Sequence, residues 1–145
     1  MLYWHLADMK TTIDCYNKAI EIHPQNTLAH YNKGIALIYL ERNEDAIECY
    51  DNVLAIDPNH SDAINGKAFA LANLDKNEQA LPIIQKVLES DSNNEYYLST
   101  AAFIMYKLER YDESKNYYNK ALEINPNLKD TLSESDLKVF NSVMK

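Results

Sequence analysis

The chain has 145 residues, of which 46% are hydrophobic and 25% are charged, and its formal net charge is −8 at pH 7. This composition is typical of a globular domain or a short repeat array with enough apolar residues for a core. The acidic balance disfavours nucleic acid and anionic membrane surfaces as partners, because both are bound mainly through basic residues. Two glycines and four prolines are too few turn residues for an all-β protein of this length.

A 34-residue period runs along the chain. Pro24 and Pro58 lie 34 residues apart, and Pro126 follows Pro58 at twice that distance, with Ser92 at the position between them. Four columns of side chains share the same spacing: Thr12, Ala46, Ala80 and Ser114; Tyr16, Tyr50, Ile84 and Tyr118; Ala19, Val53, Val87 and Ala121; Gly34, Ala68 and Ala102. Self-similarity at such a period predicts a stack of repeated structural units.

Each unit is predicted to be a pair of helices, and residues 27–60 give the clearest example. The first part places apolar side chains at helical spacing. Asn43 then stands where an N-cap is expected, and Glu44 and Asp45 follow in the first turn, where acidic side chains complement the helix dipole. Pro58 is expected to end the second helix, because proline disfavours helix at the residue before it.

The small columns predict where the two helices of a unit approach most closely. Helices pack tightly only where no side chain holds them apart, so Gly34 or Ala68 is expected to face Ala46 or Ala80. Pro82 lies about one turn into a predicted second helix, where we expect it to remove one backbone hydrogen bond and bend the helix slightly.

These columns resemble the tetratricopeptide repeat, a helical hairpin with a 34-residue period. By this resemblance, three complete repeats occupy residues 27–60, 61–94 and 95–128, and residues 1–26 are the later part of another. The resemblance implies an all-α fold, an α-solenoid in which antiparallel hairpins form a right-handed superhelix.

Residues 129–145 do not follow the columns and are predicted to form a C-terminal capping helix. Ser133 followed by Asp136 resembles a capping box, in which the serine side chain bonds the backbone of the first helical turn. An apolar stripe then follows, made of Leu137, Phe140, Val143 and Met144. We expect this helix to cover the second helix of the last repeat, with a disordered tail as the alternative.

The N-terminal end is interpreted as an incomplete hairpin. Met1 enters the first repeat partway along its first helix, whose remnant consists of Met1, Leu2, Tyr3, Trp4 and Leu6. The ends of repeat arrays normally need a polar cap, so this end is expected to leave apolar surface unpaired. We therefore expect self-association here, and a self-assembly module forming a homo-oligomer is the alternative to an adaptor.

The resemblance also implies a concave groove, lined by the first helix of each repeat, that holds a peptide or a partner helix. The residues expected to bind the partner are Trp4, Tyr31, Asn32, Ile35, Tyr39, Asn65, Phe69, Asn73, Tyr96, Phe103, Tyr106 and Lys107. Aromatic side chains with a polar tip suit recognition, and asparagines offer a donor and an acceptor. We expect the four tyrosines to be exposed, while packing between repeats is the alternative for Ile35, Phe69 and Phe103.

Chaperone-binding members of this family grip an acidic C-terminal peptide with basic side chains. The matching positions in this chain hold Tyr31, Ile35, Gly66, Tyr96 and Thr100, none of which is basic. The expected partner is therefore a protein or peptide other than an acidic chaperone C-terminus, with no role for nucleic acid or a membrane.

No enzyme motif is present, so we expect no catalytic residue, no cofactor and no metal. The four histidines do not pair with cysteine or acidic residues at metal-ligand spacing, and glycine-rich phosphate loops and GxSxG are absent. Cys15 and Cys49 occupy equivalent positions in successive repeats, which places them beyond the ~7 Å limit of a disulfide. Two free thiols favour an intracellular, cytoplasmic protein. An accessory domain of a larger enzyme is a third hypothesis.

Overall fold

The computed structural model describes the backbone of residues 2–145 and the side chains from Ala7 onward. Every regular element in this part of the chain is helical: α1 (Leu2–Ile22), α2 (Thr27–Tyr39), α3 (Asn43–Ile56), α4 (Ser61–Asn73), α5 (Asn77–Ser90), α6 (Glu95–Lys107), α7 (Tyr111–Ile124), the 3₁₀ helix η1 (Leu128–Thr131) and α8 (Glu134–Val143). The chain divides into two compact units, residues 1–70 and 71–145, with the boundary inside α4. The prediction of an all-α fold built from short helices is confirmed.

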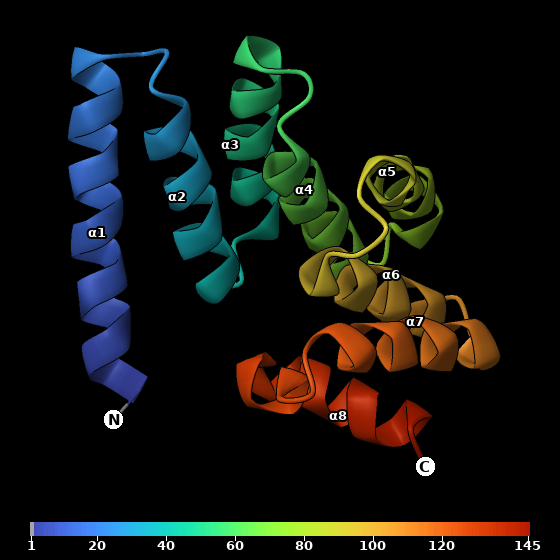
Figure 1. Ribbon diagram of the computed structural model, residues 1–145. Helices are drawn as coiled ribbons and strands as arrows, with labels where there is room; N and C mark the ends of the chain where they lie inside the picture. The colour runs from blue at the N-terminus through green and yellow to red at the C-terminus, as the bar shows by residue number, and fades with distance from the viewer. Residues whose placement is uncertain (1) are drawn as a thin grey trace. The chain divides into compact units, whose positions relative to one another are not determined.

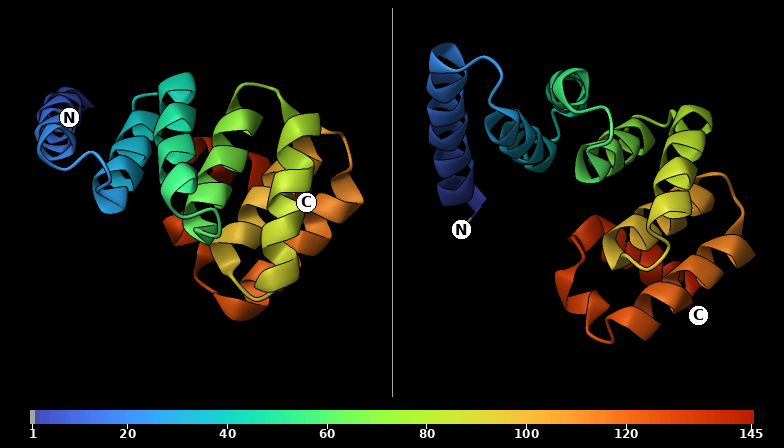
Figure 2. Two further views of the ribbon diagram at one scale, coloured as in Figure 1. Left: turned by 90° about the horizontal axis from the view of Figure 1, so that it is seen from above. Right: turned by 45° about the horizontal axis from the view of Figure 1, so that its top comes forward.

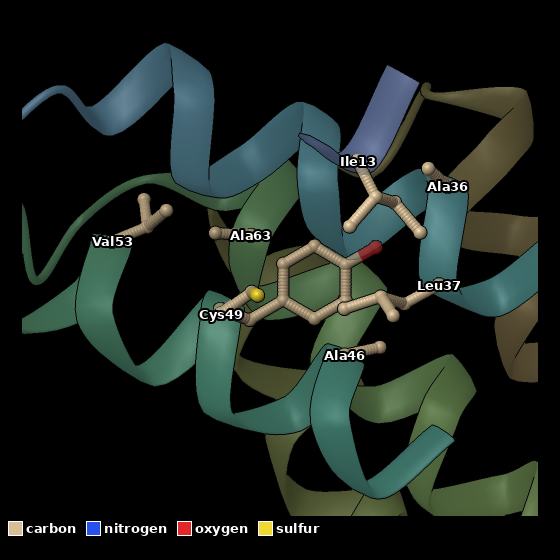
Figure 3. Packing of buried hydrophobic residues seen from close by; sticks show 8 residues of the cluster. Ile13, Ala36, Leu37, Ala46, Cys49, Val53 and Ala63 are labelled. Carbon is tan, nitrogen blue, oxygen red and sulfur yellow. The ribbon is translucent and has the colours of Figure 1, made fainter. Parts of the chain in front are cut away.

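In residues 1–70, α2 packs against both α1 and α3 (Figures 1 and 2). The core of this unit gathers around Tyr50 of α3, which is 2% exposed. The buried cluster that contains Tyr50 draws on α1, α2, α3 and α4, and Figure 3 labels its other members: Ile13, Ala36, Leu37, Ala46, Cys49, Val53 and Ala63. The apolar stripes predicted from helical spacing therefore meet in one cluster.

The ring of Tyr50 lies against both glycines of the chain. A Cβ atom added at Gly34 of α2 would lie 2.7 Å from Tyr50 Cε1, and one added at Gly66 of α4 would lie 2.5 Å from Cζ. Gly34 was predicted to face Ala46, but its nearest partner is this tyrosine ring. The ring needs the space that two absent side chains leave, which explains why both helices carry glycine there despite its low helix propensity.

In residues 71–145, α6 packs against α5, α7 and α8, and α8 also contacts α7. The hydroxyl of Ser114 on α7 donates a 2.7 Å hydrogen bond to the backbone oxygen of Ala102 on α6, so here two small-residue columns do face each other. Ser114 and Ala102 are both fully buried. Close approach of the paired helices is therefore the reason for the small columns.

The C-terminal capping helix is confirmed. Ser133 is the N-cap of α8, and its hydroxyl accepts a 3.2 Å hydrogen bond from the backbone N–H of Asp136. Phe140 is 1% exposed and meets the ring of Tyr118 on α7 edge to face, at 4.9 Å between centroids. Leu128 of η1, which the sequence analysis did not single out, is also buried in this cluster.

The three hairpin turns, which follow α2, α4 and α6, share one geometry. After α2, the N–H of Arg42 donates to the oxygen of Leu37 at 2.9 Å, and the residue between the helices, Glu41, has a φ of 57°. The same pattern of bonds recurs at the other two turns, where Asp75 and Glu109 have φ values of 58° and 60°. These are Schellman-type helix ends with an acidic residue at the left-handed position that usually holds glycine.

The prediction that the N-terminal end is an incomplete hairpin is wrong. The expected remnant of a first helix is not separated by a turn from the helix that follows, because α1 is a single unbroken helix over Leu2–Ile22. The residue equivalent to Glu41, 34 positions earlier, is Ala7, and it lies inside α1. Alanine has the highest helix propensity, and a left-handed conformation costs it roughly 1–2 kcal/mol. The local sequence therefore favours continuing the helix.

Two smaller expectations about helix ends and interruptions have mixed outcomes. Asn43 is the first residue of α3 and not its N-cap; Arg42 holds the cap position and makes no side-chain capping bond. Asn43 is buried instead, with its side-chain amide 3.4 Å from the oxygen of Glu41. Pro82 lies inside α5, which continues through it from Asn77 to Ser90, and the slight bend expected there stays a prediction.

Candidate partner-binding surface

The first helices of the hairpins, α2, α4 and α6, carry the residues predicted to bind a partner, apart from Trp4 of α1. Each unit is described separately. In residues 1–70, Tyr39 at the end of α2 is 68% exposed. Asn32 and Ile35 of α2 and Phe69 of α4 are half-buried. Tyr39 is therefore the most accessible of the predicted residues whose side chains are described in this unit, and the expectation that it is exposed is confirmed.

The expectation that Tyr31 is exposed is wrong: it is half-buried, because it packs against two other rings. Its centroid lies 6.1 Å from that of Tyr50 and 5.4 Å from that of His60. Burial, and then the nearby carboxylate of Asp62, raise the pKa of the Tyr31 hydroxyl. His60 is held in turn, since its Nδ1 accepts a 3.3 Å hydrogen bond from the N–H of Ala63. Tyr31 thus packs on the buried core residue Tyr50 while part of its own side chain remains accessible.

Asn65 of α4 has an unused hydrogen-bond acceptor. Its side chain is half-buried, and its Oδ1 atom is buried without a hydrogen-bond partner among the residues described. An amide oxygen in that position costs free energy until a donor reaches it. Because this oxygen is enclosed, it is not a contact point for a partner.

In residues 71–145, Tyr96 near the start of α6 is 57% exposed. It follows Asn94, whose side-chain oxygen caps α6 by accepting from the N–H of Tyr96 at 3.0 Å. Tyr106 is half-buried and meets Tyr111 edge to face at 5.7 Å between centroids. Only 8% of Phe103 is exposed, so for this residue the alternative of internal packing holds.

Lys107 does not carry a free charge on this surface. Its Nζ atom lies 2.5 Å from Oδ1 of Asp75 and 5.8 Å from the centroid of the Phe103 ring. Asn73 in the same hairpin as Asp75 is half-buried and has an interaction of its own. Sequence reasoning missed Asp75, although its place in the 34-residue column of Glu41 and Glu109 marks it as a turn residue.

Trp4 lies outside the residues whose side chains are described. Among those that are described, no group of histidine, cysteine and acidic residues is arranged to hold a metal ion. None of the described helices combines the length and apolar character needed to cross a membrane. Both cysteines are free, as predicted, with Cys15 exposed and Cys49 buried.

Helical hairpins with small, buried contact columns and exposed aromatic residues on their first helices define an α-solenoid repeat protein. Models of the tetratricopeptide repeat (TPR) match residues 1–26, 27–60 and 95–128, which together make up more than half of the chain. The chain therefore belongs to the tetratricopeptide repeat family. Members of this family typically act as protein-interaction scaffolds, and that general class applies here.

Solved structures with the same fold share little sequence with this chain. TTC0263, a thermophilic TPR protein in Thermus thermophilus, has a TM-score of 0.80 and 16% identity, over 99% of this chain and 78% of that one. MamA from Desulfovibrio magneticus RS-1 has a TM-score of 0.71 and 19% identity, over 94% and 84%. YrrB, a TPR protein with an unusual peptide-binding site, has a TM-score of 0.67 and 17% identity, over 99% and 80%. No curated protein matches the sequence.

Proposed function

We propose that this protein is an adaptor that binds a peptide or a helix of a partner protein on the first-helix surface of each unit, meaning the exposed faces of α2 and α4 in residues 1–70 and, separately, the exposed face of α6 in residues 71–145. Residues 61–94 are taken in this proposal as a repeat of the same kind as those on either side. The observation that carries it is the exposure of Tyr39 and Tyr96, at 68% and 57%, on helices whose other faces are buried. Exposed tyrosines supply large contact area with a polar tip, as binding hot spots do.

The pairing of Lys107 bears on which kind of partner fits this surface. Lys107 is already neutralised by Asp75, so this lysine is not free to hold an acidic tail. This supports the expectation of a partner other than an acidic chaperone C-terminus.

The test uses a peptide-display library selected against the whole chain. The selected peptides are then measured against Tyr39→Ala and Tyr96→Ala, which we expect to weaken binding about tenfold or more, as truncation of a hot-spot aromatic does. Ile124→Ala is the matched control, because Ile124 is 41% exposed on α7, a second helix. Tyr31 is a poor choice, since its loss would also disturb the packing of Tyr50. Equal binding by all variants would refute the proposal.

Self-assembly through α1 is the second candidate, and one observation favours it. Thr12, Tyr16 and Ala19 are only partly buried in α1, whereas the residues of the same columns in the later helices are buried. A second copy that covered this face would bury them. Light scattering over a concentration series tests this, and a chain that stays monomeric at about millimolar concentration would exclude a dimer of useful affinity.

A further inference from the structure

Residues 1–70 contain a cleft on the side of α2 that faces away from Tyr39. Its volume is about 550 Å³, and residues of α1, α2 and α3 line it. Its floor is apolar and made of Ile13, Leu37 and Cys49, all buried. Lys33 and Leu37 line it from α2, and at 100° per residue they lie on the side of that helix opposite to Tyr39. This α1–α3 cleft is therefore separate from the first-helix surface, and its size is typical of a ligand site.

The lining of the cleft carries charges of both signs: Arg42 and Asp45 form an ion pair at 2.6 Å, and four other charged residues line the cleft as well. Lys10 and Asp14 line it from α1, Lys33 from α2 and Glu48 from α3, and none of the four forms an ion pair with any residue whose side chain is described. Asp14 and Glu48 stand 34 residues apart, so they occupy the same position on two successive second helices. The cleft thus has two free cations and two free carboxylates over one apolar floor.

Two further features of the lining bear on which ligand fits. Lys33 is half-buried, and its charge acts on the buried Cys49 thiol, lowering its pKa against the larger opposite effect of burial. Asn17 from α1 and Asn52 from α3 add two amides, each with a donor and an acceptor. A phosphate or other anion would meet repulsion from the two carboxylates, whereas a ligand with both charges would be attracted at both.

We propose that the α1–α3 cleft is a second binding site, which takes a short peptide segment carrying one acidic and one basic side chain next to an apolar residue. The apolar side chain enters above Ile13, Leu37 and Cys49. The acidic side chain pairs with Lys33 or Lys10, and the basic one with Asp14 or Glu48. The amides of Asn17 and Asn52 bond the peptide backbone between them.

The test is a nuclear magnetic resonance titration of the whole ¹⁵N-labelled chain with capped peptides, which carry no terminal charges. The probe is acetyl-Glu-Leu-Lys-amide, and the comparison peptides replace its charged pair by two glutamates or by two lysines. We expect saturable shifts at the side-chain amides of Asn17 and Asn52 with a dissociation constant on the order of 1 mM. The two single-sign peptides should bind at least about threefold more weakly.

Two variants separate this site from the first-helix surface. Lys33→Gln should weaken the mixed-charge peptide about three- to tenfold, because it removes a half-buried cation. Tyr39→Ala, on the other side of α2, should leave its affinity unchanged. If Lys33→Gln fails to fold by circular dichroism, Asp14→Asn, at an exposed position of α1, serves in its place with an expected loss of about two- to fivefold.

Several outcomes would overturn the proposal. One is the absence of saturable shifts at Asn17 and Asn52 up to about 20 mM peptide. Another is equal affinity for the mixed-charge peptide and the two single-sign peptides, which would show that the cleft does not distinguish ligands by their charges. Binding of free leucine as tight as that of the capped peptide would make this a small-molecule zwitterion site. Loss of binding in Tyr39→Ala but not in Lys33→Gln would place the peptide on the first-helix surface.

Discussion

The hydroxyl of Ser114 donates a hydrogen bond across the hairpin to the backbone oxygen of Ala102, 2.7 Å away and fully buried. The bond joins α7 to α6 where the helices leave no room for a larger side chain. We expect Ser114→Ala to cost about 0.5–1.5 kcal/mol of the free energy of unfolding, because only the bond is lost. Ser114→Leu should cost about 1–3 kcal/mol, because it overpacks the contact. Urea denaturation of both variants separates the effect of losing the hydrogen bond from the effect of a larger side chain. An equal loss of the free energy of unfolding in both variants would contradict the prediction that the contact has no room for a larger side chain.

Gly66→Ala should destabilise the protein although alanine is the better helix former. The new Cβ would lie 2.5 Å from Cζ of Tyr50, and we expect a net loss on the order of 1 kcal/mol. In a Tyr50→Leu background the ring is gone, so the same substitution should stabilise by up to about 1 kcal/mol. The coupling is measured in a double-mutant cycle by urea denaturation, and additive effects would show that the ring and the glycine do not depend on each other.

Phe140→Ala should release the C-terminal capping helix. Phe140 is 1% exposed and meets the ring of Tyr118 edge to face, so truncation is expected to cost about 3–5 kcal/mol. Hydrogen exchange should rise first in α8 and then in α7, because α8 covers that helix. Val143→Ala, at a half-buried position of the same helix, is the control and should cost much less. Faster exchange confined to α1–α3 would not fit this structure.

The stability of the protein should carry a pH dependence from Asp136. Burial raises the pKa of this carboxyl, against the lowering effect of its hydrogen bonds with Ser133. The folded chain then takes up the proton at a higher pH than the unfolded chain, so the contribution of Asp136 to stability improves as the pH falls from neutral toward about 4. Thermal unfolding of wild type and Asp136→Asn over this range measures it. The thermal stability of the wild type should rise relative to that of the variant as the pH falls. A stability difference that stays constant over this range would contradict the raised pKa of Asp136.

The two thiols should react at very different rates with a disulfide reagent at about pH 8, just below the ordinary thiol pKa. Cys15 is exposed, whereas Cys49 is buried, and burial raises the pKa of the Cys49 thiol. We expect Cys49 to react at least about tenfold more slowly, since it must first become accessible and ionise. A Cys15→Ser variant should keep only the slow phase, and denaturant should abolish the difference in the wild type. Two equal rates without denaturant would show that Cys49 is not enclosed.

The sequence predicted the parts of this fold that depend on periodic burial. The columns of Ala46 and Tyr50 recur every 34 residues because every hairpin has to bury the same positions, and the structure buries them from α3 onward. The apolar stripe that contains Phe140 predicted α8, because one face of that helix also has to be buried. Periodicity also indicated which helices carry the first-helix surface, but not which side chains remain exposed on it.

The rest depends on tertiary contacts between different columns and on turns without a glycine signal. Gly66 faces Tyr50, which belongs to the preceding repeat, and no column linked the two residues. The turns at Glu41, Asp75 and Glu109 use a left-handed residue other than glycine, so turn chemistry gave no signal for them. The burial of Phe103 and the pairing of Lys107 with Asp75 are set by the neighbours that tertiary packing brings close.

The two glycines on either side of Tyr50 determine how this array can be re-engineered. A cassette of residues 27–60 moved into another TPR array would take Tyr50 and Gly34 with it but leave Gly66 behind. The transplanted ring would then meet whatever side chain the host supplies at that position. The smallest module that can be exchanged intact is therefore longer than one period, and a chimera joined at residue 60 needs a glycine grafted into the following helix.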